Sequence, residues 1–353
     1  MTRNPLADEL FTEIAKIPLI DSHSHIDPRK PTSRSLEDIL GYHYYTELAH
    51  SAGMSKESLA ANRSSRERVQ SVMTHMSRFD NTAQFGWFLE IAQTFLGYRK
   101  SRLDPADADS LFDTAERVMA AADWETRVLE RSNIEKIFLT NDFDDPLQGF
   151  DTNRYVPCLR TDDLVFHFDK QEVRERLARA TGVEPRDAKG MRDSLARLFD
   201  HFTKNGARAC AISLPPDFTP GPRSEQEFAD DMKASGRCRE GVFWVLAELC
   251  QDYGLPFDLM IGVNRRIYEQ GVFQGQDLFD QRTSLIQYAK LFNSFPDVTF
   301  CVSVLTSVQN QELVSYSWIF PNVVAHGHWW YSNIPVYISN DLRARLQAIP
   351  KIK

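Results

Sequence analysis

The sequence predicts an α/β fold, a TIM-like (β/α)8 barrel. Three observations lead to this prediction: short apolar runs alternate with helical patterns, nearly every run is apolar throughout, and polar residues repeatedly follow the runs. The strands of such a barrel are parallel and buried on both faces, and the site lies at their carboxyl ends. A doubly wound sheet would favour a glycine-rich first turn, which residues 21–25 do not supply.

The first third of the chain is predicted to be mainly helical. The spacing of apolar residues predicts a helix over 7–16, which Pro18 ends and a strand follows. Ser35 is expected to cap a short helix that ends at Gly41. The pattern then stays helical, so that a helical excursion of about 35–131 separates the first strand from the second.

The remainder of the chain continues the alternation of strands and helices. Six further strands are predicted at 134–140, 155–159, 207–214, 256–262, 298–304 and 323–328. Helices are predicted around 171–202, 244–253, 284–295 and 336–348. We therefore expect a single domain over residues 1–353, with seven strands found and the eighth strand absent from this chain.

Composition limits the class of protein. With 353 residues, of which 42% are apolar and 11% aromatic, the chain can bury a substantial core. A net charge of −8 argues against nucleic acid or an anionic membrane as partner. The sequence contains no apolar stretch of about 18 residues and its first residues contain no apolar signal core, so we expect a cytoplasmic protein.

The number and the positions of the cysteines also fit a cytoplasmic location. The chain has five of them, scattered and without a C-x-x-C pair. Cys158, Cys210 and Cys301 lie within apolar, strand-like runs, so we expect them to be reduced core residues.

Two histidines at the end of the first predicted strand are candidate metal ligands. Alternate residues of a strand share a face, so His23 and His25 are expected to point the same way and Ser24 the other way. A zinc-type cation takes imidazole nitrogens and carboxylates, and a catalytic site keeps one position open. The alternative is a pair of surface histidines. His326 and His328 form a second pair after the seventh strand, and a position near the metal and a supporting role both stay open for them.

Five stretches carry motifs in a fixed order. They are residues 13–25 with D-x-H-x-H, 41–44 with G-Y-H-Y, 129–146 with L-E-R-S-N-I and D-D-P, 157–162 with P-C-L-R-T-D, and 329–331 with W-W-Y. Together they resemble the uronate isomerase (glucuronate isomerase) family of the amidohydrolase superfamily. D-x-H-x-H alone would indicate only the superfamily, whereas the ordered set is specific. The resemblance implies an amidohydrolase-type barrel and a divalent metal, with zinc expected.

The activity that the resemblance implies is the interconversion of an alduronate and its ketouronate, such as glucuronate and fructuronate. A proton moves between adjacent carbons, so a metal or donor must stabilise enediolate-like charge and a base must carry the proton. By resemblance, His43 and Tyr44 line the substrate site and share this proton transfer. The alternative for both is an aromatic cluster that packs for stability.

The substrate is expected to be a small sugar acid, and a homo-oligomer stays open. Arg160 is the candidate that binds its carboxylate, because a guanidinium offers two parallel donors. The alternative is an ion pair with Asp162 or Asp163. Arg265 is a candidate substrate contact or an exposed loop charge.

The aromatic motif near the end of the chain gives two more candidates. Trp329 and Trp330 are expected to wall the pocket or to pack in the core.

The chain departs from the family in three places. Met260 stands where the family has a histidine, and Thr46 and Glu47 stand where it has Trp-Arg. The family's eighth strand carries an aspartate that this chain does not reach. Two other functions therefore stay open: a metal-dependent hydrolase of the same superfamily, and a non-catalytic barrel that binds sugar acids.

Overall fold

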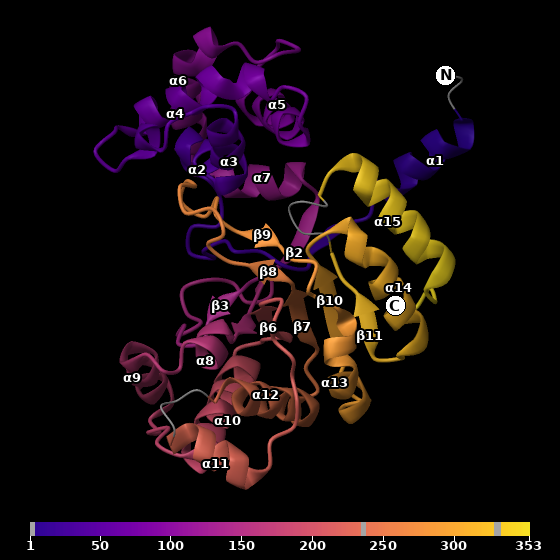
Figure 1. Cartoon of the computed structure of the whole chain (residues 1–353). Coiled ribbons are helices and arrows are strands. Elements are labelled where there is room, and N and C mark those ends of the chain that lie inside the picture. Colours follow the sequence, from indigo (N-terminus) through magenta and orange to yellow (C-terminus); the bar gives the residue numbers. More distant parts are fainter. Residues whose placement is uncertain (1–3, 234–237, 328–332) are drawn as a thin grey trace. The chain divides into compact units, whose positions relative to one another are not determined.

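The computed structural model describes residues 4–233, 238–327 and 333–353 (Figure 1). The chain divides into two compact units. The helical unit comprises Met1–Leu19, Arg29–Glu135 and Arg265–Leu278. The sheet unit comprises Ile20–Pro28, Lys136–Asn264 and Phe279–Lys353. The assignment of residues 1–353 to a single barrel domain stays a prediction.

The helical unit is built from α-helices joined by short turns and 3-10 helices. The α-helices are α1 (Pro5–Ile14), α2 (Leu36–Leu40), α3 (His43–Ser51), α4 (Ser65–His75), α5 (Ala83–Leu96), α6 (Ala108–Met119) and α7 (Trp124–Arg131). The 3-10 helices are η1 (Lys56–Leu59), η2 (Met76–Arg78) and η3 (Pro105–Asp107). Apolar residues of α2 to α7 form one buried cluster, which includes Leu40, Ala49, Met73, Phe88, Ala115 and Trp124.

Helix α2 begins and ends where the sequence predicts. The Ser35 side chain accepts from the Asp38 N–H, and the Asp38 carboxylate accepts from the Ser35 N–H, which forms a capping box. Gly41 follows the last residue of the helix. His43 opens α3 directly afterwards, with the extended Tyr42 as its N-cap. His43 and Tyr44 therefore belong to the first turn of α3, which follows directly after the end of α2.

The sheet unit has parallel strands. A three-stranded sheet has the order β1-β2-β4, with β1 (Leu19–Asp21), β2 (Ile134–Phe138) and β4 (Tyr155–Val156). A six-stranded sheet has the order β11-β10-β7-β6-β5-β3, with β3 (Asn141–Asp142), β5 (Cys158–Arg160), β6 (Ala209–Leu214), β7 (Phe257–Ile261), β10 (Phe300–Val304) and β11 (Val323–Ala325). Every neighbouring pair of the six-stranded sheet is parallel, which confirms an α/β fold with parallel sheets. The short strands β8 (Val263–Asn264) and β9 (Leu278–Phe279) pair separately.

From β5 to β11, helices connect the consecutive strands of the six-stranded sheet, as is usual for parallel pairs. They are α8 (Asp162–Phe166), α9 (Gln171–Thr181), α10 (Ala188–Lys204), α11 (Glu225–Lys233), α12 (Arg239–Tyr253), η4 (Leu285–Tyr288), α13 (Ala289–Ser294), η5 (Ser307–Gln309) and α14 (Asn310–Ile319), and α15 (Pro335–Ala348) follows β11. The predicted strand at 155–159 is divided at Pro157. The residues before Pro157 form β4, which pairs with β2, and the residues after it form β5, which pairs with β6. Pairing is interrupted between them because proline has no N–H to donate to a neighbouring strand.

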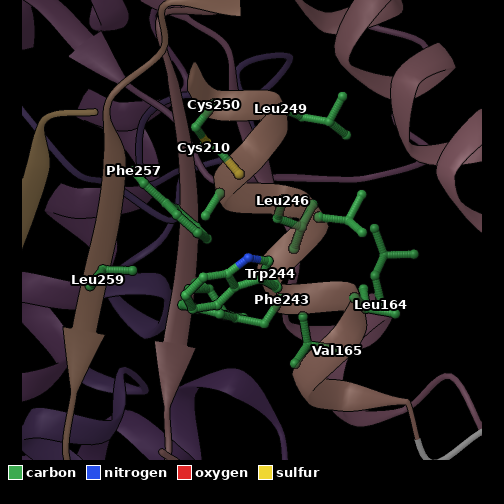
Figure 2. Close-up of a cluster of buried hydrophobic side chains, with 14 of the residues drawn as sticks. Leu164, Val165, Cys210, Phe243, Trp244, Leu246, Leu249, Cys250, Phe257 and Leu259 are labelled. Carbon is green, nitrogen blue, oxygen red and sulfur yellow. The ribbon is translucent and has the colours of Figure 1, made fainter. Parts of the chain in front are cut away.

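The two faces of the six-stranded sheet differ in chemistry. One face is apolar and packs against α8, α10 and α12, and Figure 2 shows Phe257 and Leu259 of β7 together with Phe243 and Leu246 of α12 in this core. The other face carries a row of residues in register across four strands. The row is Arg160, Ala211, Asp258 and Cys301. We call this side the polar face.

All five cysteines are free thiols, and Cys301 is the least buried of them. Burial raises the pKa of Cys238 and Cys301 to about 12. The expectation that Cys158 and Cys210 are core residues is confirmed, since both are buried. Within the described residues, no helix combines the length and the apolar character that crossing a bilayer requires. The cytoplasmic location stays a prediction.

An ion-pair cluster on the sheet unit gives a pH-dependent prediction. Arg176 donates to both carboxylate oxygens of Asp144, at 2.8 and 2.5 Å, and to Asp163 at 3.0 Å. The hydrogen bonds from Arg176 lower the pKa of Asp144. The carboxylate therefore stabilises the fold above its unfolded pKa of about 3.9, and this contribution disappears as the pH falls through the lower folded value.

We expect Asp144→Asn to lower the free energy of unfolding at pH 7 by about 1–2 kcal/mol. The difference from the wild type should shrink below about pH 4, as the carboxylate becomes protonated first in the unfolded chain and then, at lower pH, in the folded protein. Denaturant unfolding measured from pH 7 to pH 3 checks this. A difference that is constant over the whole range would contradict it.

Candidate metal centre

The two histidines of the first motif converge on one point. Their Nε2 atoms lie 3.3 Å apart. Two nitrogens bound to one tetrahedral zinc at 2.0–2.1 Å would lie about 3.3 Å apart. The spacing of His23 and His25 therefore fits two ligands of a shared cation.

The segment that carries these histidines is not a strand, which corrects the sequence prediction. Strand β1 ends at Asp21, before both residues. Hydrogen bonds to the end of β2 and to the residues just after it hold the segment instead. The Ser24 N–H donates to the Phe138 carbonyl at 2.9 Å, and the Thr140 hydroxyl donates to the Ser24 carbonyl at 3.1 Å. The two rings still meet, because these bonds fix the backbone between them.

Each imidazole is also held through its other nitrogen. His23 Nδ1 lies 3.3 Å from Asp258 Oδ2, and His25 Nδ1 lies 2.9 Å from Thr140 Oγ1. This is how metal-binding histidines are commonly oriented in proteins. Among the described residues, no group of three or more His, Cys, Asp or Glu side chains is arranged to hold a metal. A cation placed between the two rings would therefore need further ligands, such as water or a substrate oxygen.

Asp258 connects this pair to a third histidine. It lies on the polar face of β7 and is 5% exposed. Its Oδ1 is 3.2 Å from His326 Nδ1, and His326 Nε2 is 2.9 Å from the Ser22 hydroxyl. Burial opposes ionisation of Asp258, but the hydrogen bonds from His23 and His326 lower its pKa overall. His326 and His23 therefore contact the same carboxylate. His328 falls outside the described residues.

Sequence reasoning did not identify Asp258. A signal was present, since a carboxylate inside the apolar run 256–262 must be paired if it is buried. The identity of its partners could not be read from the sequence, because they come from segments far away in the chain. Met260, two residues further on, is buried on the same face.

Arg160 lies in the same register row as Asp258, two strands away. Adjacent strands are about 4.8 Å apart, so the two backbones are separated by roughly 10 Å, and their side chains share a face. The Nε and Nη2 atoms of Arg160 donate to Asp162 at 3.1 and 3.4 Å, so the predicted ion-pair alternative is present. The side chain is 32% exposed, and no described residue bonds its Nη1. An anion can therefore still reach it.

His43 and Tyr44 lie in the helical unit. His43 Nδ1 is 2.6 Å from Glu47 Oε1, one helical turn later. The rings of Tyr42, His43 and Tyr44 are in mutual contact, with centroids 4.5–5.0 Å apart, so the aromatic-cluster alternative is also present. Burial raises the pKa of Tyr44, which keeps the phenol protonated and able to donate. Sequence reasoning did not name Glu47 as a partner, although its i,i+4 spacing from His43 is the signal for such a pair.

The remaining candidates are Arg265, Trp329 and Trp330. Arg265 begins the last segment of the helical unit, is 51% exposed through its side chain, and pairs with Asp277 at 2.6 Å. This is the exposed loop charge of the alternative prediction. Trp329 and Trp330 lie outside the described residues. The site roles of all these residues stay predictions.

Comparisons with known proteins agree on one family. The family model for glucuronate isomerase matches residues 1–238. A uronate isomerase of Brucella canis is 25% identical over 374 residues, covering 94% of this chain and 79% of that protein. The uronate isomerase of Thermotoga petrophila is 22% identical over 390 residues, covering 96% and 82%.

Solved structures show the same fold. The crystal structure of a uronate isomerase from Thermotoga maritima superimposes with a TM-score of 0.88 at 18% identity, covering 98% of this chain and 84% of that one. A uronate isomerase from Bacillus halodurans gives 0.81 at 23% identity, covering 99% and 81%. The α/β architecture with parallel sheets is thus shared. The chain belongs to the glucuronate isomerase family, and it is an isomerase.

Proposed function

We propose that the protein is a metal-dependent aldose–ketose isomerase that acts on a hexuronate such as glucuronate. The observation that carries this proposal is the facing pair of Nε2 atoms, 3.3 Å apart, with each ring held through Nδ1. A divalent cation, with zinc as the expected ion, would supply Lewis-acid stabilisation of negative charge on the substrate oxygens. Family membership supports the hexuronate as substrate.

The reaction needs a proton transfer in addition to a cation. A proton leaves C2 of the aldose and reaches C1, while the hydroxyl proton of O2 passes to O1, so the carbonyl moves from C1 to C2. We propose His43 as the group that carries the proton, since its Nδ1 is paired with Glu47, which orients the ring, and imidazole is the side chain that most often transfers protons in catalysis. Tyr44, kept protonated by burial, is proposed as a donor to a substrate oxygen.

Binding of the sugar acid is assigned to Arg160. Its guanidinium shares the polar face with Asp258, which holds His23. A charge-assisted hydrogen bond to the carboxylate would orient the sugar with respect to the cation. Arg265 and the two tryptophans Trp329 and Trp330 are proposed as further substrate contacts.

We also propose that the strands belong to a (β/α)8-type barrel wall. The consecutive, all-parallel order from β3 to β11 supports this, because it is the order in which barrel strands follow each other. The absence of the eighth strand stays a prediction.

The test of function uses the full 353-residue chain. The protein is stripped of metal, supplied with zinc, cobalt or manganese, and incubated with glucuronate or galacturonate, and the ketouronate is quantified by chromatography. We expect turnover that requires the cation. Absence of a ketose with every cation and both substrates would overturn the proposal. Turnover that stays unchanged after complete metal removal would overturn the metal requirement alone.

A further inference from the structure

One buried carboxylate joins the metal pair to a distant part of the sheet unit. Asp258 is shared between His23, through Oδ2, and His326, through Oδ1. His326 in turn contacts the hydroxyl of Ser22, the residue before His23. We call these four residues the Asp258 bridge. It holds both the ring of His23 and the backbone from which that ring projects.

The chemistry of the contacts fixes the protonation of His23. A carboxylate only accepts hydrogen bonds, so the Nδ1 atom that faces it must carry the proton. A neutral imidazole protonated on Nδ1 has its lone pair on Nε2, the atom that faces His25. Only this tautomer can donate a lone pair to a cation placed between the two rings.

The position of Asp258 makes the bridge rigid. It is the second residue of β7, a strand paired on both sides by β6 and β10. The residues before and after it, Phe257 and Leu259, are fully buried in the core (Figure 2). The backbone that carries the carboxylate is therefore held by hydrogen bonds on both sides. Little water competes for the hydrogen bonds of the carboxylate, because Asp258 is buried.

His25 is held in a different way. Its Nδ1 faces the hydroxyl of Thr140, which also donates to the Ser24 carbonyl. The single proton of the Thr140 hydroxyl goes to the Ser24 carbonyl, so the hydroxyl can only accept from His25 Nδ1, which therefore carries a proton as well. His23 is thus held by a buried carboxylate and His25 by a hydroxyl.

We propose that Asp258 is a positioning residue for the cation: it selects the metal-binding tautomer of His23 and, through His326 and Ser22, fixes the segment that carries it. This inference rests on the proposed metal pair. It assigns to Asp258 a share of the cation affinity without direct contact with the cation. Loss of such a partner typically costs 10- to 100-fold in metal affinity.

The test measures cation affinity rather than turnover. Zinc or cobalt binding to the full chain is determined by competition with a chromophoric chelator, for the wild type, Asp258→Asn and His326→Gln. We expect Asp258→Asn to weaken binding by about 10- to 100-fold, and His326→Gln to weaken it less, because the contact with His23 remains. Asp341→Asn is the matched control: Asp341 is equally buried in the same unit and accepts a hydrogen bond from the Ser307 hydroxyl.

A second measurement reads the tautomer directly. The nitrogen chemical shifts of ¹⁵N-histidine-labelled, metal-free protein distinguish protonated Nδ1 from protonated Nε2. We expect His23, assigned with His23→Ala, to be protonated on Nδ1 in the wild type and to become a mixture in Asp258→Asn. A merely structural role of Asp258 would change the unfolding free energy but not this tautomer.

The outcomes separate this inference from the proposed function. Wild-type affinity in Asp258→Asn, together with an unchanged His23 tautomer, overturns the inference and leaves the isomerase proposal intact. If cation binding depends on Asp258 but the protein turns over no uronate, the result supports the inference and overturns the proposed function. A wild-type protein that binds no cation overturns both.

Discussion

His23→Ala is expected to lower kcat/KM for a hexuronate by at least about a thousandfold and to remove the bound cation. A thousandfold loss corresponds to about 4 kcal/mol of barrier, within the several kcal/mol that a Lewis-acid cation supplies. The substitution removes one of the two facing Nε2 atoms and also leaves Asp258 with only His326 as a partner. Metal content by mass spectrometry and initial rates with added cation are the measurements.

The control for this prediction is His75→Ala. His75 lies in α4 of the helical unit and bonds the Ser71 carbonyl. It should keep wild-type metal content and rate. His25→Ala should behave like His23→Ala, because a shared cation needs both nitrogens. If either variant keeps both the cation and the rate, the pair is not the metal site.

Arg160→Met is expected to lower kcat/KM for the hexuronate by about 100- to 1,000-fold, mainly by raising KM. Each tenfold loss is 1.4 kcal/mol, so the expected range is about 3–4 kcal/mol, comparable with one or two charge-assisted hydrogen bonds to a carboxylate. The comparison substrate is the aldose that lacks the carboxylate. The wild type and Arg160→Met should differ far less with it, because the lost contact is specific to the acid.

Arg160 also bonds Asp162, so a structural effect has to be separated. Asp162 accepts from the Ser213 N–H as well, which keeps it partly satisfied when the guanidinium is removed. Arg160→Lys keeps the charge but not the two parallel donors, and it should lie between the wild type and the methionine variant. An equal loss with the uronate and the aldose would show that Arg160 acts through the fold. An unchanged KM for the hexuronate would show that Arg160 does not bind its carboxylate.

Much of the fold could be predicted because its signals are local. Ser35 and Gly41 lie next to the helix they delimit, and five strands of the six-stranded sheet, β5, β6, β7, β10 and β11, coincide with predicted apolar runs, whereas β3 does not. The division of one predicted strand at Pro157 needed knowledge of the pairing on both sides. Helix α14 was not predicted, because Trp318 and Ile319 are exposed and its apolar stripe is correspondingly weak.

The site shows the same distinction. The spacing of His23 and His25 is a local signal, and it was enough to predict that the two rings point the same way; that they share a cation stays a prediction. Asp258 and Thr140 were not predicted as their partners, because those contacts join segments that only the folded sheet unit brings together. The pair of His43 with Glu47 is local and was within reach of the sequence.

The contact between Ser22 and His326 has a consequence for synthesis. It joins residues 304 positions apart. Closing so long a loop has an entropic cost, and contacts of this kind form late. During synthesis on the ribosome, His23 therefore meets Asp258, which selects its tautomer, only after β7 has emerged, and the segment around Ser22 is fixed only after His326, the residue that follows β11, has emerged and docked.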